Sequence, residues 1–135
     1  MKKTGSAIED DLYALIGASS LKNTIGGAIY KDGFRPVGSN AEDAVIIFAG
    51  GLDGQFQDGI VIVNIFVPNI NNGGTVKVKN NSRCRQLEIK ANDWLSSLKP
   101  TDYKFSLDAM IMSKQSPEIE QYYINVRIKF SFKTF

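Results

Sequence analysis

The side chains best suited to catalysis in this 135-residue sequence are one cysteine and two small groups of carboxylates. The sequence has no histidine, so it lacks the usual general base near neutral pH, the common Ser-His and Cys-His nucleophile pairs and the commonest zinc ligand. Cys84 falls on the apolar stripe of an expected helix, where a cysteine usually serves as a small core residue. We therefore expect a protein without a catalytic nucleophile, a metal ion or a cofactor.

The carboxylates have structural explanations as well as a catalytic one. Glu9, Asp10 and Asp11 fall near the start of an expected helix, where the helix dipole favours negative charge. Glu42 and Asp43 fall in an expected solvated loop before a strand, and adjacent residues of a strand face opposite sides. Catalysis by carboxylates stays open as an alternative, but we expect no enzymatic activity.

Composition and charge are those of an ordinary globular protein. Apolar residues make up 43% and charged residues 22% of the sequence, and we expect one domain that spans 1–135. The 16 basic and 14 acidic residues leave a net charge of +2, which is too even to indicate a dedicated nucleic-acid surface. A single cysteine is typical of a reducing compartment.

No export signal or membrane segment is predicted. The acidic residues at 9–11 come before an apolar signal region can form. The longest apolar stretch, 59–67, is far shorter than the roughly 20 residues of a membrane-spanning helix. These patterns favour a protein that is intracellular, or is delivered without a secretion signal, and that makes no membrane contact.

Two helices are predicted from apolar residues spaced three and four apart. The first spans about 7–16, and Ser6 and Glu9 at its start have the spacing of a capping box. The second begins near Cys84 and ends before Pro100. Its apolar face is formed by Cys84, Leu87, Ala91, Trp94, Leu95 and Leu98.

Five strands are predicted, with loops at 50–54 and 113–118. The strands fall at 28–30, 44–49, 60–67, 103–111 and 124–132. The run at 60–67 is nearly continuous in apolar residues, so we expect a central strand that is covered on both faces. The order of elements predicts an α+β fold, with an antiparallel or mixed sheet of about five strands and two α-helices packed on one face.

The polar side of the last strand is the first candidate for partner contacts. Arg127, Lys129 and Lys133 lie in a line there, and Lys104 is expected on a neighbouring strand. These cations suit phosphate, an acidic patch of a partner, or water alone. A small nucleic-acid-binding module that uses this basic strand is the alternative function, although the aromatic residues of the strand fall on its other side and could not stack with bases there.

A polar loop is the second candidate. It contains Asn69, Asn71, Asn72, Gly73 and Gly74, residue types that favour tight turns or mobility. We expect this loop to become ordered on assembly.

The layout of the whole sequence resembles the tail-terminator (tail-completion) proteins of long-tailed bacteriophages and prophages. The shared features, in chain order, are an acidic helix at 8–16, the segment Ile-Gly-Gly-Ala-Ile-Tyr at 25–30, an Arg-Pro loop at 35–36, a strand entry at 42–47 and a long strand at 60–67. A helix and two closing strands complete the layout, so the resemblance spans most of the chain.

The resemblance implies an α+β subunit that assembles into a homo-oligomeric ring, commonly a hexamer. Such a ring caps the tail tube at its head-proximal end, stops tube polymerisation and offers a surface to the head connector. Related head–tail joining proteins have a similar layout, so the position in the virion stays open. The resemblance implies a protein of the host cytoplasm during assembly and of the virion afterwards. The basic strand is then a candidate lining for a lumen through which DNA passes non-specifically.

Overall fold

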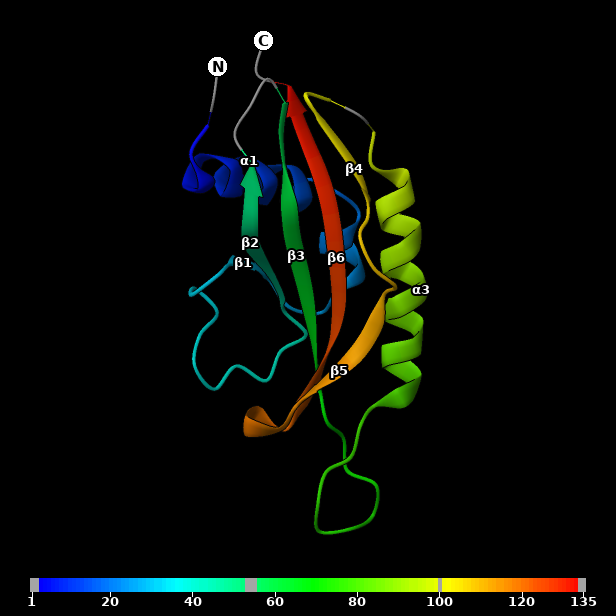
Figure 1. The fold of residues 1–135 in the computed structure, drawn as a ribbon. Coiled ribbons are helices and arrows are strands. Elements are labelled where there is room, and N and C mark those ends of the chain that lie inside the picture. The colour runs from blue at the N-terminus through cyan, green and yellow to red at the C-terminus, as the bar shows by residue number, and fades with distance from the viewer. Residues whose placement is uncertain (1–2, 53–55, 100, 134–135) are drawn as a thin grey trace.

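A computed structural model describes residues 3–52, 56–99 and 101–133, which form a twisted, mixed six-stranded sheet with helices packed against it (Figure 1). The predicted α+β fold is confirmed, with one strand more than expected. The helices are α1 (Gly5–Gly17), α2 (Leu21–Thr24), α3 (Asn81–Ser97) and the 3-10 turn η1 (Pro117–Ile119). The strands are β1 (Ile29–Lys31), β2 (Ala44–Leu52), β3 (Phe56–Pro68), β4 (Tyr103–Leu107), β5 (Met112–Ser116) and β6 (Gln121–Lys133).

Strand β6 organises the sheet. The strand order is β1-β2-β3-β6-β4, and only β1 and β2 are parallel. One edge of β6 pairs with β3 along 121–133. Its other edge is shared, because β5 pairs with 121–125 and β4 pairs with 128–132. Three strands therefore pair directly with β6, and β3 pairs with β2 as well.

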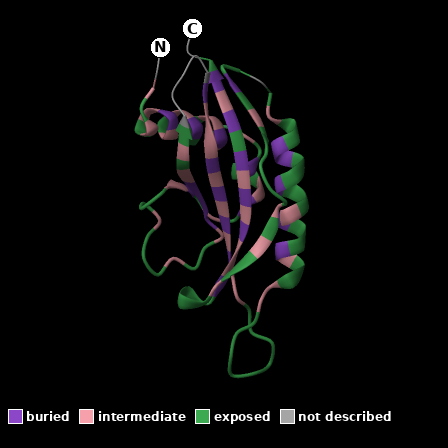
Figure 2. Cartoon of the chain, in the orientation of Figure 1, coloured by how far each residue is buried: buried purple, intermediate pink, exposed green. Residues whose placement is uncertain are grey.

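The hydrophobic core lies between one face of the sheet and the helices. Alternate residues of the central strands are buried on that face, as with Val61 and Val63 of β3 and Val126 and Ile128 of β6 (Figure 2). The predicted apolar face of α3 is confirmed, since Cys84, Leu87, Ala91, Trp94 and Leu95 are buried. None of the helices in the described ranges is both long enough and apolar enough to cross a bilayer.

The prediction that the strand at 60–67 is covered on both faces is wrong. Ile60, Ile62 and Phe66 point away from the helices and are only partly buried. The strand is central because β2 and β6 flank it, not because a second layer covers it. A continuous apolar run therefore leaves a partly exposed apolar face here.

The first helix begins earlier than predicted. Its N-cap is Thr4, whose extended backbone lets the side-chain oxygen accept a hydrogen bond from the Ala7 amide. The Ser6–Glu9 capping box is therefore wrong, because both residues already lie inside the helix. Glu9, Asp10 and Asp11 consequently fall beyond the first turn, where the dipole explains little of their charge. The end of α3 at Ser97 agrees with the prediction, and Pro100 lies outside the described residues.

Two predicted loops are partly strand. Gly50 and Gly51 continue β2 beyond a bulge that follows Phe48, and the rest of the loop at 50–54 includes residues outside the described ranges. The segment 113–118 was expected as a loop but contains most of β5, and the predicted strand at 103–111 stops at Leu107. An edge strand pairs along only one of its two sides, so polar residues such as those of β5 can form one.

Candidate assembly surface

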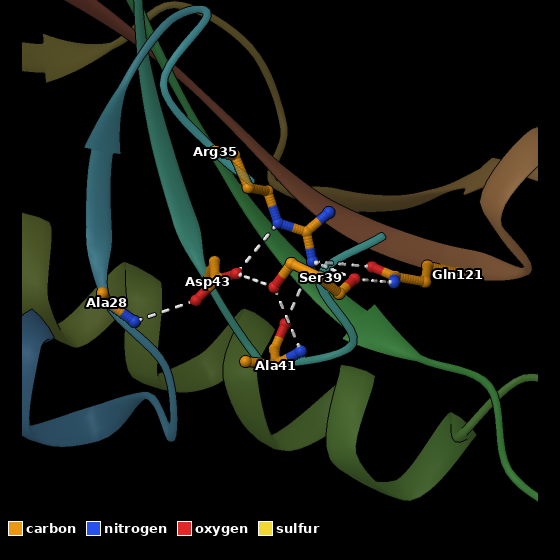
Figure 3. Close-up of polar contacts among 6 residues, drawn as sticks. All are labelled: Ala28, Arg35, Ser39, Ala41, Asp43 and Gln121. Atoms are coloured by element: carbon orange, nitrogen blue, oxygen red, sulfur yellow. Dashed lines mark hydrogen bonds and ion pairs between the residues drawn. The ribbon is translucent and has the colours of Figure 1, made fainter. Parts of the chain in front are cut away.

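A buried carboxylate fixes the loop between β1 and β2 (Figure 3). Asp43, just before β2, is only 1% exposed. Its two oxygens accept hydrogen bonds from the Ala28 amide (2.9 Å), the Ser39 hydroxyl (2.6 Å) and Nε of Arg35 (3.0 Å). Burial by itself raises the pKa of Asp43, but these bonds outweigh it and hold the pKa below the ordinary value of 3.8.

Arg35 connects this loop to the sheet. Nη2 of Arg35 donates to the carbonyl of Ala41 and to Oε1 of Gln121, both at 3.0 Å. Its guanidinium also lies 4.2 Å from the centre of the Phe66 ring on the outer face of the sheet. These contacts connect the loop to the sheet, and the prediction that the loop is solvated is wrong for Asp43, which is buried.

Glu42 lies in a different ion pair from its neighbour. Arg83 of α3 donates to Oε1 of Glu42 at 2.6 Å and to Oε2 at 2.8 Å. The same guanidinium donates to the carbonyl of Thr24. The two adjacent carboxylates thus serve two separate structural contacts, as expected for neighbours that point apart.

The acidic group of α1 has similar structural partners. Asp11 binds the ammonium of Lys3 and accepts a hydrogen bond from the hydroxyl of Tyr103 at 2.8 Å. Asp10 binds Lys31. Burial, reinforced by the Asp11 carboxylate, raises the pKa of the Tyr103 phenol far above its ordinary value. These contacts join α1 to β1 at one edge of the sheet and to β4 at the other.

The predicted basic strand is present but contains neutralising acids. Arg127, Lys129 and Lys133 lie on the side of β6 that faces away from the helices, as the sequence predicts, and Lys104 of β4 pairs across from Ser131. These four cations are the basic strand face. Asp108 forms an ion pair with Arg127 at 2.7 Å.

Two more acids lie close by on this side of the sheet. Asp58 is paired across from Ser131, and Asp102 shares a surface hollow with Lys104 and Lys133. The structure brings Lys104 and Lys133 together around that hollow, while Lys129 borders another hollow with Ile60. The basic strand face is therefore a mixed-charge surface.

The predicted polar loop is the tip of a longer projecting arm, which we define as residues 69–80 (Figure 1). Two hydrogen bonds of 2.8 Å join Ile70 and Val78 at its base. Asn71, Asn72, Gly73 and Gly74 form the exposed tip, and Gly73 adopts a positive φ of 81° that suits glycine. Asn69 lies below the tip, and its buried Oδ1 has no hydrogen-bond partner within the described residues.

An exposed apolar edge was missed by the sequence analysis. Large apolar side chains are exposed around β5, where Met110 is 81% exposed and Met112 about half exposed. Leu107 and Ile119 extend this group on either side. We call these four residues the open edge. Leu107 and Met110 fell in the segment expected as a strand, and Met112 and Ile119 lay just outside the expected loop at 113–118. The pattern gave no sign that these side chains would be exposed near the edge of the sheet.

Comparison with models of protein families gave no match for this sequence, and comparison with curated proteins gave none either. The described surface has three features that suit binding, which are an exposed arm, an exposed apolar edge and a mixed-charge strand. The thiol of Cys84 is buried, and burial raises its pKa, which leaves it a poor nucleophile.

Proposed function

We propose that this chain is a non-enzymatic phage virion assembly protein of the tail-terminator kind. In this proposal it forms a homo-oligomeric ring that caps the tail tube and joins it to the head connector. The observation that carries the proposal is that a projecting arm and an exposed apolar edge occur on one small subunit. Exposed apolar groups of this kind are typical of surfaces that become covered on assembly.

The placement of these surfaces supports a ring. The arm leaves the sheet between β3 and α3, whereas the open edge surrounds β5. Contact between two different surfaces of identical subunits is heterologous, and such contacts generate closed rings when the rotation closes. The order of elements, which resembles that of tail terminators, suggests where such a ring would act. We place the protein in the host cytoplasm during assembly and in the virion afterwards.

Measurement of the assembled mass tests this proposal. Native mass spectrometry and sedimentation velocity at micromolar concentration, with and without tail-tube protein, should give a closed oligomer, with a mass near six times 14.9 kDa for a hexamer. A strict monomer that binds neither the tube protein nor the head connector would contradict it.

The alternative of a nucleic-acid-binding module has less support from the surface. Asp58, Asp102 and Asp108 lie among the cations of the basic strand face, and Arg127 is engaged by one of them. Passage of DNA through a ring requires only weak, non-specific contact with Lys129 and its neighbours. Fluorescence anisotropy with a labelled DNA at about 50 mM salt separates the two cases: tight binding that falls steeply with salt favours the module, and undetectable binding removes it.

A further inference from the structure

We propose that the arm of one copy adds as an extra strand to the β5 edge of a neighbouring copy. This inference rests on the self-assembly proposed above and names the two surfaces that meet. Addition of an extended segment to an open sheet edge is a common mode of recognition, in which backbone hydrogen bonds give affinity and side-chain contacts give specificity.

The donor is the second half of the arm. Thr75, Val76, Lys77, Val78 and Lys79 alternate apolar and polar residues and are rich in β-branched side chains, which is the pattern of a strand with one buried face. In the isolated chain these valines are exposed, Val76 by 70%. No amide between 71 and 77 is hydrogen-bonded to another backbone group of the described chain. Apart from the bridge between Val78 and Ile70, the segment therefore has the sequence of a strand but no strand partner within the described residues.

The acceptor is the outer side of β5. This strand pairs with β6 along one side, and its other side has no strand partner within the described residues. Met110 and Met112 are exposed beside this unpaired backbone. Long unpaired edges with exposed apolar side chains readily pair with another chain.

The side chains of the two segments are complementary. Because strand residues alternate between faces, a register that sets Val76 beside Met112 sets Lys77 on the opposite face, beside Ser113. The hydroxyl of Ser113 donates to the carboxylate of Glu88 on α3, so a negative charge lies on the side that Lys77 would face.

The remaining charges near β5 fit the same arrangement. Glu118 and Glu120 follow β5 and form no ion pair with a described residue, so they add negative charge at its end. Lys114 lies on the Met112 side, where its aliphatic stem can cover Val78 while its ammonium stays in water. Lys79 lies 5.0 Å above the Tyr122 ring of its own chain, and the backbone of Val78 is hydrogen-bonded to Ile70. These contacts hold the base of the arm and leave the backbone of 75–77 for pairing.

Disulfide trapping between two single variants tests the contact directly. Equal amounts of Val76→Cys and Met112→Cys protein are mixed, oxidised and analysed by mass spectrometry. We expect a disulfide-linked pair that contains one copy of each variant, and the buried Cys84 should stay reduced. The matched control mixes Val37→Cys with Met112→Cys, since Val37 is fully exposed on the β1–β2 loop. Equal yields from both mixtures would overturn the proposed pairing.

A second measurement uses the assembly equilibrium. The Val76→Lys/Val78→Lys variant should raise the dissociation constant of the oligomer by about tenfold or more, because it removes two apolar side chains from the contact. The Val37→Lys variant should leave it unchanged. Far-UV circular dichroism should be the same for all three proteins, since these valines are exposed.

The possible results separate this inference from the proposed function. Wild-type assembly that the arm variant leaves intact would overturn the pairing while a ring formed by other surfaces still stands. Intact assembly with loss of binding to tail-tube protein would assign the arm to that protein instead of a second copy. A wild-type chain that stays monomeric would overturn both proposals.

Discussion

At the scale of single residues, the charged carboxylate of Asp43 is almost completely buried from water. A buried carboxylate is costly unless it is paired and hydrogen-bonded. Here a guanidinium, a hydroxyl and a backbone amide all donate to it. The ion pair therefore fixes the β1–β2 loop against β6 through Arg35 and Gln121.

Replacing Arg35 should show how much of the fold depends on this pair. Arg35→Ala leaves the Asp43 carboxylate buried without its counter-charge, so we expect a loss of about 3–5 kcal/mol in the free energy of unfolding. Urea denaturation followed by circular dichroism measures it. Arg85→Ala is the matched control, because Arg85 is exposed on α3 and should change stability by less than about 0.5 kcal/mol. Equal losses for both variants would contradict this account.

The same carboxylate makes stability depend on pH. Its folded-state pKa is lower than 3.8, so the unfolded chain takes up the proton more readily as pH falls. The stability that Asp43 contributes is therefore complete above the unfolded pKa and is lost as pH falls through the lower, folded pKa. We expect the gap in free energy of unfolding between wild type and Asp43→Asn to be smaller at about pH 2.5 than at about pH 6. Asp93→Asn, at an exposed position of α3, is the matched control for replacing an aspartate by asparagine.

At the scale of elements, β2, β3 and β6 approach closely at a glycine. A Cβ on Gly59 would lie 2.5 Å from the carbonyl oxygen of Gly50 and 2.8 Å from the Phe130 ring. Such contacts require the strands or the ring to move apart. The bulge after Phe48 brings this carbonyl to its position, so the glycine and the bulge act together.

Two glycine substitutions should therefore act in opposite directions. Gly59→Ala should destabilise the protein by about 1–3 kcal/mol, the usual cost of overpacking. Gly17→Ala should stabilise it by up to about 1 kcal/mol, because Gly17 ends α1 with no atom near its missing Cβ. Thermal unfolding of both variants, measured side by side, checks the signs. A neutral Gly59→Ala would contradict the close approach.

A tyrosine hydrogen bond links α1 to β4. The hydroxyl of the buried Tyr103 donates to the partly exposed Asp11 carboxylate, which also binds Lys3. Tyr103→Phe should lower the free energy of unfolding by about 1.5–3 kcal/mol, the range for a hydrogen bond to a charged group. Tyr13→Phe, at an exposed position of α1, should have almost no effect. Urea titration of the two variants provides the comparison.

The main elements were predictable because their periodicity reflects one buried face. The apolar stripe of α3 and the alternation of β6 each follow directly from contact with the core on one side. Strand β5 was not predictable in this way. Its residues Met-Ser-Lys-Gln-Ser show no apolar alternation, and the strand exists because β6 extends far enough to pair with it.

The candidate surfaces were predictable only in part. The line of cations on β6 follows from alternation, but the acids that neutralise it come from β3, from the turn before β4 and from the turn after β4. The local composition, rich in asparagine and glycine, predicted the polar loop at the tip of the arm. The strand-like pattern at 75–79 was also present in the sequence, where alternation of Val76 and Val78 with two lysines was the signal that could have located it.

At the scale of the whole molecule, one connected core joins the sheet to α1, α2 and α3. It includes Leu12 of α1, Leu21 of α2, Leu87 of α3 and the inner residues of the central strands. We expect a single cooperative unfolding transition in urea. Circular dichroism of the sheet, fluorescence of the single tryptophan, Trp94, and reaction of Cys84 with a thiol reagent should give the same midpoint. Separate midpoints would indicate more than one unit.

The central position of β6 has a consequence for how the chain folds. Its partners β3, β4 and β5 all precede it in the sequence, and its pairing with β3 closes loops of roughly 50 residues or more. During synthesis these strands emerge from the ribosome before the strand that unites them. Non-local pairing of this kind is slow, and strands that are not yet paired can aggregate with other chains during this time. The polar composition of β5 and the lysines of the arm would then also keep the nascent chain soluble until β6 completes the sheet.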